Sequence, residues 1–156
     1  MDADAPGGAR LSSGMPVTSS STTPTVPAQF QSFLAFDFGL KRTGVAVGTR
    51  MLRSASPQGT IKADGEAARF AQVAERIREW QPDALVIGVP YHPDGAPHEN
   101  TARALKFGRQ LRGRFGLQVF EVDERYSTTE AIASGAADAD AASACIILEQ
   151  FLRNLP

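Results

Sequence analysis

Hydrophobic and polar residues follow clear periods in the first half of this chain. Two short apolar runs, separated by a polar turn, occupy residues 33–48, which predicts two paired strands. A weaker third strand is expected over 58–62. Residues 64–80 then carry apolar side chains at helical spacing with charged side chains between them, and Pro82 stops the pattern. We therefore expect an antiparallel meander followed by an amphipathic helix.

The second half of the chain alternates strands and helices. Residues 84–90 are nearly all apolar, which predicts a strand buried on both faces. A helix over 101–112, ending near Gly113, and a half-exposed strand over 118–123 follow. A last helix is expected over 140–152, and a capping-box pattern of the form Ser-x-x-Glu begins another helix before it. Strands separated by helices pair in parallel, so we expect an α/β fold with a mixed five-stranded sheet and helices packed on its faces.

The N-terminal segment has a different composition from the rest. Residues 1–29 are rich in Gly, Pro, Ser, Thr and Ala, and they offer too little apolar surface to offset the entropy of ordering. We therefore expect a disordered tail over 1–29 and one domain over 30–156. The tail lacks the cationic start and apolar core of a secretory signal. Met15 is an alternative start of translation, which an intact-mass measurement would test.

Composition narrows the possible functions. The 16 Lys and Arg residues against 17 Asp and Glu give a net charge of -1, so any nucleic-acid site must rest on a local cationic patch. The single cysteine, Cys145, excludes an internal disulfide and a cysteine-based metal cluster, which fits a reducing cytosol. No apolar run approaches the roughly 18 residues that a membrane span needs.

Three carboxylates fall at the ends of predicted elements: Asp37 in the first strand, Glu124 after the fifth and Asp140 at the start of the last helix. If the first strand is central and the fifth runs parallel to it, Asp37 and Glu124 meet at one sheet edge, where α/β proteins bind ligands. The last helix could bring Asp140 to them. Converging carboxylates repel one another, and all-oxygen ligation of Mg²⁺ or Mn²⁺ would relieve this repulsion. Two such ions about 4 Å apart would support phosphodiester hydrolysis.

Each carboxylate also has a simpler explanation. Asp37 could hydrogen-bond the amides of the turn that follows it. Glu124 could pair with Arg125 or remain solvated, and Asp140 could cap its helix. Asp138 competes with Asp140 for either role. Spacing alone therefore leaves a structural and a metal-binding interpretation open.

Four segments in order form a more specific pattern: residues 36–48, 86–95, 122–131 and 140–149. Over about residues 32–154 the sequence resembles the YqgF family, also called RuvX, whose fold is similar to that of ribonuclease H and of the Holliday junction resolvase RuvC. The resemblance implies a ribonuclease H-like, metal-dependent endonuclease. It further implies a role in trimming the 5′ end of the 16S ribosomal RNA precursor, during ribosome biogenesis in the bacterial cytoplasm.

The resemblance places the acidic triad of the family on Asp37, Glu124 and Asp140, as catalytic residues and as ligands of Mg²⁺ or Mn²⁺. It favours Asp140 over Asp138, because Asp138 matches no family position. Basic and hydroxyl residues beside the triad are the candidate contacts to nucleic acid, holding phosphates that flank the scissile bond. These candidates are Lys41, Arg42, Arg125 and Thr128.

Several other choices stay open in the sequence. Tyr91 could stack on a base or pack within a surface loop. The cations of the second helix, Lys106, Arg109, Arg112 and Arg114, could extend a phosphate track or form a solvated face. A four-way DNA junction is an alternative substrate, and resolving one usually takes a symmetric dimer, so both a monomer and a homodimer are considered. A non-catalytic module that binds nucleic acid or the transcription machinery is the hypothesis from another class.

Overall fold

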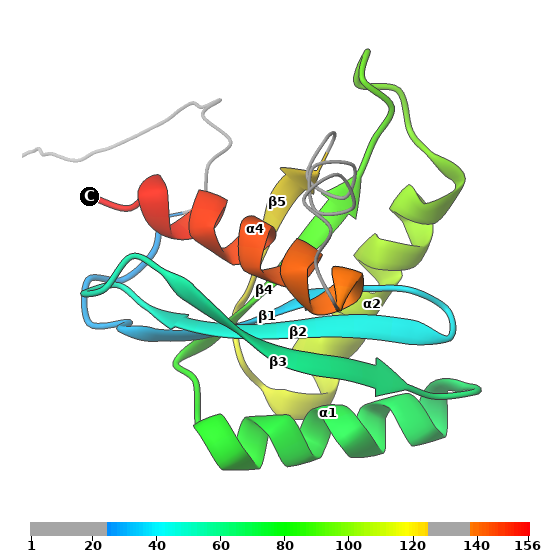
Figure 1. The fold of residues 1–156 in the computed structure, drawn as a ribbon, viewed down its shortest axis with the longest axis horizontal. Helices are drawn as coiled ribbons and strands as arrows, with labels where there is room; N and C mark the ends of the chain where they lie inside the picture. The colour runs from blue at the N-terminus through cyan, green and yellow to red at the C-terminus, as the bar shows by residue number, and fades with distance from the viewer. Residues whose placement is uncertain (1–24, 125–137) are drawn as a thin grey trace, which may run out of the picture.

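A computed structural model describes residues 25–124 and 138–156 of the chain, which form a five-stranded sheet with helices on both faces (Figure 1). The strands are β1 (Ser32–Asp37), β2 (Arg42–Thr49), β3 (Ala55–Lys62), β4 (Ala84–Pro90) and β5 (Val119–Glu124). The helices are α1 (Glu66–Trp80), α2 (Glu99–Phe115) and α4 (Ala139–Arg153).

The strand order is β3-β2-β1-β4-β5, with β1 at the centre. Strand β1 pairs antiparallel with β2 and parallel with β4, and β4 pairs parallel with β5. The predicted mixed sheet is therefore confirmed. The carboxyl ends of β1, β4 and β5 consequently meet at the same edge, which is the arrangement expected for Asp37 and Glu124.

Two elements are longer than the periodicity predicts. Strand β3 begins at Ala55 instead of residue 58, and it tolerates Pro57 because it lies at the edge of the sheet. Helix α2 begins earlier because His98 caps it: its ring accepts a hydrogen bond from the Asn100 amide at 3.1 Å. The helix passes through Gly113 and ends at Phe115, and its C-cap, Gly116, has a positive φ of 66°, which suits a residue without a side chain.

The two faces of the sheet are both covered. Helix α4 lies over one face, here called the α4 face, and α1 and α2 lie over the other, here called the α2 face (Figure 1). Successive residues of β1 alternate between them, so Phe33 and Ala35 join the α4-face cluster while Leu34 and Phe36 join the α2-face cluster. The sheet is thus the middle layer between two apolar interfaces.

Helix α4 is held at both ends by polar contacts. At its C-terminal end Arg53 donates to the carbonyl oxygens of Leu152 and Leu155, at 2.8 and 2.6 Å. At its N-terminal end Asp138 accepts hydrogen bonds from the Ala141 amide at 3.1 Å and from the Thr60 hydroxyl at 2.7 Å. These contacts fix where the first turn of α4 lies above the sheet.

None of the helices within 25–124 and 138–156 has the length and apolar character needed to cross a membrane.

Candidate active site

Asp37 and Glu124 reach the same place from two parallel strands. Asp37 is the last residue of β1 and continues the α4-face alternation of Phe33 and Ala35. Glu124 is the last residue of β5, it is buried, and it continues the alternation of Phe120 on that same face. Two carboxylates therefore end on the α4 face at one edge of the sheet.

Gly88 of β4, the strand between β1 and β5, provides the room for Glu124. A Cβ atom at this position would lie 2.7 Å from the Glu124 Oε2 and 2.4 Å from the Ile147 Cδ1. Both distances are too short for atoms that are not bonded. The absence of a side chain on β4 thus lets the Glu124 carboxylate and α4 approach the strand closely.

Asp140 arrives from the first turn of α4. A Cβ atom on Gly44 would lie 1.8 Å from the Asp140 backbone oxygen, so the helix start rests directly on the backbone of β2. Gly44 is the partner of Asp37 in the antiparallel ladder between β1 and β2. Gly44 therefore brings the helix, and with it Asp140, to the end of β1.

The electrostatics of Asp37 show that the three carboxylates interact. Burial raises the pKa of Asp37 well above its ordinary value, and the negative charges of Glu124 and Asp140 raise this pKa further. A hydrogen bond from the Ser143 hydroxyl acts in the opposite direction, and Asp37 also shares a hydrogen bond with Glu124. Burial and, after it, the two neighbouring negative charges together disfavour the charged form of Asp37.

Arg42 partly neutralises this negative charge. Its Nε donates to the Asp140 Oδ2 at 2.7 Å, and both side chains remain partly exposed. The part of the chain that the structure describes contains no group of three His, Cys, Asp or Glu residues placed to hold a metal ion. The three carboxylates interact electrostatically, and Arg42 is hydrogen-bonded to one oxygen of Asp140.

The structure also distinguishes the simpler explanations. Asp138, and not Asp140, caps α4. Asp37 interacts with Ser143 and Glu124, while the turn after it is closed by the Thr43 hydroxyl donating to the Gly39 oxygen at 3.3 Å. Glu124 is buried and not solvated. Arg125 and Thr128, two predicted nucleic-acid contacts, and the predicted capping box lie outside the described residues.

Ser143 is the site residue that sequence reasoning missed. It lies one turn after Asp140 on α4, it is 1% exposed, and its hydroxyl bonds Asp37. A signal was present in the sequence, because Ser143 interrupts an otherwise apolar stripe that includes Ala144 and Ile147. A buried hydroxyl needs a hydrogen-bond partner, and Asp37 supplies it.

Three of the four α2 cations named in the sequence analysis make contacts within the fold. Lys106 pairs with Glu66 at 3.7 Å, on the side of the molecule opposite α4. Arg112 donates to the Val119 oxygen at 3.0 Å, and the Arg114 guanidinium lies 4.2 Å from the centre of a phenylalanine ring. Tyr91 packs against the α2-face cluster. These contacts favour the structural interpretation for this helix and for Tyr91.

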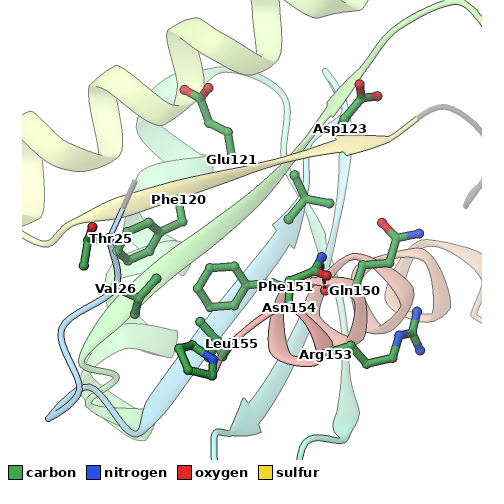
Figure 2. A pocket seen from close by; sticks show the side chains of 12 residues that line it. Thr25, Val26, Phe120, Glu121, Asp123, Gln150, Phe151, Arg153, Asn154 and Leu155 are labelled. Atoms are coloured by element: carbon green, nitrogen blue, oxygen red, sulfur yellow. Dashed lines mark hydrogen bonds between the residues drawn. The ribbon is translucent and has the colours of Figure 1, made fainter. Parts of the chain in front are cut away.

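A hollow of about 800 Å³ lies away from the carboxylates, between β5 and the C-terminal end of α4. Figure 2 shows Val26, Phe120 and Phe151 gathered along it, while Glu121 and Asp123 point to the other side of β5. It is lined by none of the three carboxylates of the candidate site. The hollow and the candidate site are therefore separate places in the fold.

The chain matches a known protein family and bacterial relatives over most of its length. The family described as "RuvX: Holliday junction resolvase" matches residues 31–154. A protein of Polaromonas sp., named "Putative pre-16S rRNA nuclease", is 72% identical over 133 residues, which cover 85% of this chain and 96% of the relative. A protein of the same name from Albidiferax ferrireducens is 69% identical over 130 residues, 83% of each chain.

Two solved structures share the fold at low sequence identity. T. thermophilus RuvC in complex with a Holliday junction substrate matches with a TM-score of 0.51 at 15% identity, over 79% of this chain and 94% of RuvC. The fowlpox virus resolvase in complex with Holliday junction DNA matches with a TM-score of 0.50 at 10% identity, over 78% of this chain and 97% of the resolvase. The ribonuclease H-like, resolvase-type fold expected from the sequence is confirmed.

Proposed function

Because the chain belongs to the RuvX family, we propose that it is a metal-dependent endonuclease that hydrolyses phosphodiester bonds at the 5′ end of the 16S ribosomal RNA precursor. One observation supports this more than any other: Asp37, Glu124 and Asp140 interact at one edge of the sheet. The names of the two bacterial relatives support the substrate. This substrate would place the activity in the bacterial cytoplasm.

The donor set suits a hard divalent cation. The three carboxylates offer only oxygen atoms, and burial together with two neighbouring charges disfavours the charged form of Asp37. Mg²⁺ or Mn²⁺, as one ion or a pair held by Asp37, Glu124 and Asp140, would offset the negative charge that disfavours ionised Asp37. When bound, the metal supplies an activated water and stabilises the charge on the leaving oxygen.

The remaining residues of the site orient a carboxylate or bind the phosphates of the substrate. Ser143 fixes the Asp37 carboxylate by its hydrogen bond. Arg42 is the first residue of β2, and Lys41 lies in the turn just before it. Both residues therefore border the carboxylates and are suited to bind the phosphates next to the scissile bond. Arg125 and Thr128 are proposed to contribute further contacts to the same strand. Their positions in the sequence, one and four residues after Glu124, support this role.

Cleavage of two substrates tests the proposal. An end-labelled precursor RNA fragment and a four-way DNA junction are incubated with Mg²⁺, Mn²⁺ or EDTA, using wild type, Asp37→Asn and Glu124→Gln. We expect metal-dependent RNA cleavage that falls by roughly two orders of magnitude or more in both variants, because each removes a carboxylate that would hold the charge-stabilising metal. Glu121→Gln, on the same strand but exposed, is the matched control and should cleave normally.

The fold neighbours justify the second substrate. RuvC and the fowlpox enzyme were both captured with Holliday junction DNA, so selective junction cutting would assign this chain to resolution instead of RNA trimming. If neither substrate is cut with either metal while binding persists, the nuclease proposal is wrong and a binding module replaces it.

A further inference from the structure

A hollow of about 340 Å³ lies where the turn after β1 meets the end of β3. Five residues line it: Lys41, Arg42, Lys62, Ala63 and Asp64. Three of the five are cations and one is an acid, so the lining has an excess of positive charge. The hollow adjoins the carboxylates, since Arg42 is also the residue that bonds Asp140. It is therefore a cationic recess beside an anionic site.

The register of β2 and β3 places Lys62 on the same face as Arg42. The two residues are direct partners in the antiparallel ladder. Directly opposed residues of such a ladder project to the same side of the sheet. Arg42 projects to the α4 face, where it contacts Asp140, so Lys62 begins on that face as well. Strand pairing thus fixes the position of the Lys62 backbone beside Arg42.

The backbone around the hollow is held in place. The Ala63 amide donates to the Lys41 oxygen at 3.0 Å, which ties the two rims together. The Gln72 side chain of α1 donates to the Lys62 oxygen at 2.9 Å. A recess with fixed backbone loses little conformational entropy when a ligand binds, beyond that of the lysine side chains themselves.

The charges of the recess are only partly used within the protein. Arg42 is paired with Asp140. Lys41 and Lys62 make no ion pair within residues 25–124 and 138–156. Lys106 on the opposite face is different, because it pairs with Glu66. The side chains of Lys41 and Lys62 are therefore available to bind an external anion.

We propose that this recess binds a backbone phosphate that neighbours the scissile phosphate in the nucleic-acid strand, and that Lys62 is a residue that binds it. The inference rests on the proposed nuclease function. A cluster of carboxylates repels a polyanion, so a strand that reaches it gains from cations just beside it. Contacts to phosphate fix the position of the strand without selecting its sequence. Lys62 therefore contributes to affinity and placement, and not to the choice of cleavage sequence.

The test measures binding without cleavage. A fluorescent single-stranded RNA from the 5′ region of the precursor is titrated with the full chain in EDTA at several salt concentrations, using wild type, Lys62→Gln, Lys62→Arg and Lys106→Gln. Loss of one phosphate contact lowers the slope of log Kd against log salt by about 0.7. We expect that change and a severalfold weaker Kd for Lys62→Gln, recovery with Lys62→Arg, and wild-type behaviour for Lys106→Gln.

Kinetics separate this inference from the nuclease proposal. In metal, Lys62→Gln should raise KM severalfold with kcat nearly unchanged. If wild type binds with the Lys62-dependent slope but cleaves nothing, the nuclease proposal fails and the phosphate site stands. If wild type cleaves and Lys62→Gln has the same Kd, slope and KM as wild type, the phosphate site is wrong and the nuclease proposal stands. Absence of RNA binding by wild type would also overturn the site.

Discussion

The central strand β1 borders two interfaces that are built differently. On the α2 face, Leu34 and Phe36 lie against an apolar layer that includes Phe107, whose ring meets that of Phe36 edge to face with centres 5.9 Å apart. On the α4 face, Phe33 and Ala35 are equally buried, but the strand then ends in Asp37. The residues of β1 that face α2 are all apolar, whereas those that face α4 change from apolar to charged along the same strand.

The two faces also differ in how closely a helix approaches. On the α4 face the first turn of α4 meets the backbone of β2 at Gly44. On the α2 face the closest comparable approach is at Gly108, where a Cβ atom would meet the end of the Ile87 side chain at 2.7 Å. We infer that the α2 face supplies stability, while the α4 face gives up some stability to hold three carboxylates together.

The largest effect on stability should come from the α2 face. Leu111 is fully buried there, so Leu111→Ala should lower the free energy of unfolding by about 2–5 kcal/mol. Cleavage by the molecules that remain folded should be unchanged, because Leu111 belongs to the apolar α2-face cluster, on the other side of the sheet from the carboxylates. Urea denaturation and single-turnover cleavage measure the two quantities. Leu111→Met is the volume-conserving control, with a cost below about 1.5 kcal/mol. A loss of activity beyond the unfolded fraction would argue against the division of roles.

Gly44→Ala should affect both stability and activity. The new Cβ atom would meet backbone atoms of Asp140, which cannot move without displacing the start of α4. We expect a loss of about 1–3 kcal/mol, typical of overpacking, together with strongly reduced cleavage.

Gly108→Ala is the matched control for Gly44→Ala, since its nearest neighbour is the end of a side chain. It should cost less stability and leave cleavage intact. Equal cleavage by wild type and Gly44→Ala would show that the close approach of α4 to β2 is not needed for the site.

Asp37→Asn should stabilise the metal-free protein at neutral pH by about 1 kcal/mol. The pKa of Asp37 is raised in the folded state by burial and by its acidic neighbours, so the folded protein holds a proton that the unfolded chain releases. The contribution of Asp37 to stability is therefore complete below its unfolded pKa and is lost as pH rises through the folded pKa. The gain in Asp37→Asn should grow with pH across that window, as measured by urea midpoints in EDTA.

The pKa of Asp138 is shifted in the opposite direction to that of Asp37. Hydrogen bonds from the Thr60 hydroxyl and the Ala141 amide lower its pKa, and it caps α4. Asp138→Ala should therefore destabilise the protein at neutral pH, by about 1 kcal/mol for a lost helix cap. Destabilisation by Asp37→Asn under the same conditions would contradict the repulsive cluster.

The smallest effect concerns the pair of Arg42 and Asp140. Metal binding to Asp140 must compete with Arg42, so Arg42→Gln should bind Mn²⁺ more tightly by up to about fivefold. The limit follows from the modest value of a partly exposed ion pair, about 1 kcal/mol or less. Calorimetry without nucleic acid measures the effect. Lys41→Gln should leave the Mn²⁺ affinity unchanged, and an unchanged affinity in Arg42→Gln would show that the pair does not compete with the metal.

The sequence was most informative about segments whose environment is uniform along their length. Strand β4 has the predicted bounds because all of its residues are apolar and all but Pro90 are buried. Helix α1 follows its apolar spacing closely. The ends of α2 were predicted less well, because a histidine caps it and Gly113 lies inside it. Caps depend on geometry that several residue types can satisfy.

Local pattern also indicated the carboxylates themselves. Asp37 was conspicuous because it lies in an apolar strand, where burying a charge is costly without a partner, and Glu124 and Asp140 because they lie at the ends of elements. Their convergence depended on the order and direction of the strands, which periodicity suggests only in outline. The parallel pairing of β1, β4 and β5 supplied it.

By itself, the sequence determined the alternation that buries each strand and the acidic residues at the element ends, because these follow from neighbours along the chain. Only the tertiary structure decided which distant groups touch: Ser143 on Asp37, Arg42 on Asp140, and Lys62 beside Arg42. These contacts join residues far apart in the sequence. They depend on how closely α4 can lie on β2 and β4, and that distance is set by two glycines whose importance appears only when the backbones meet.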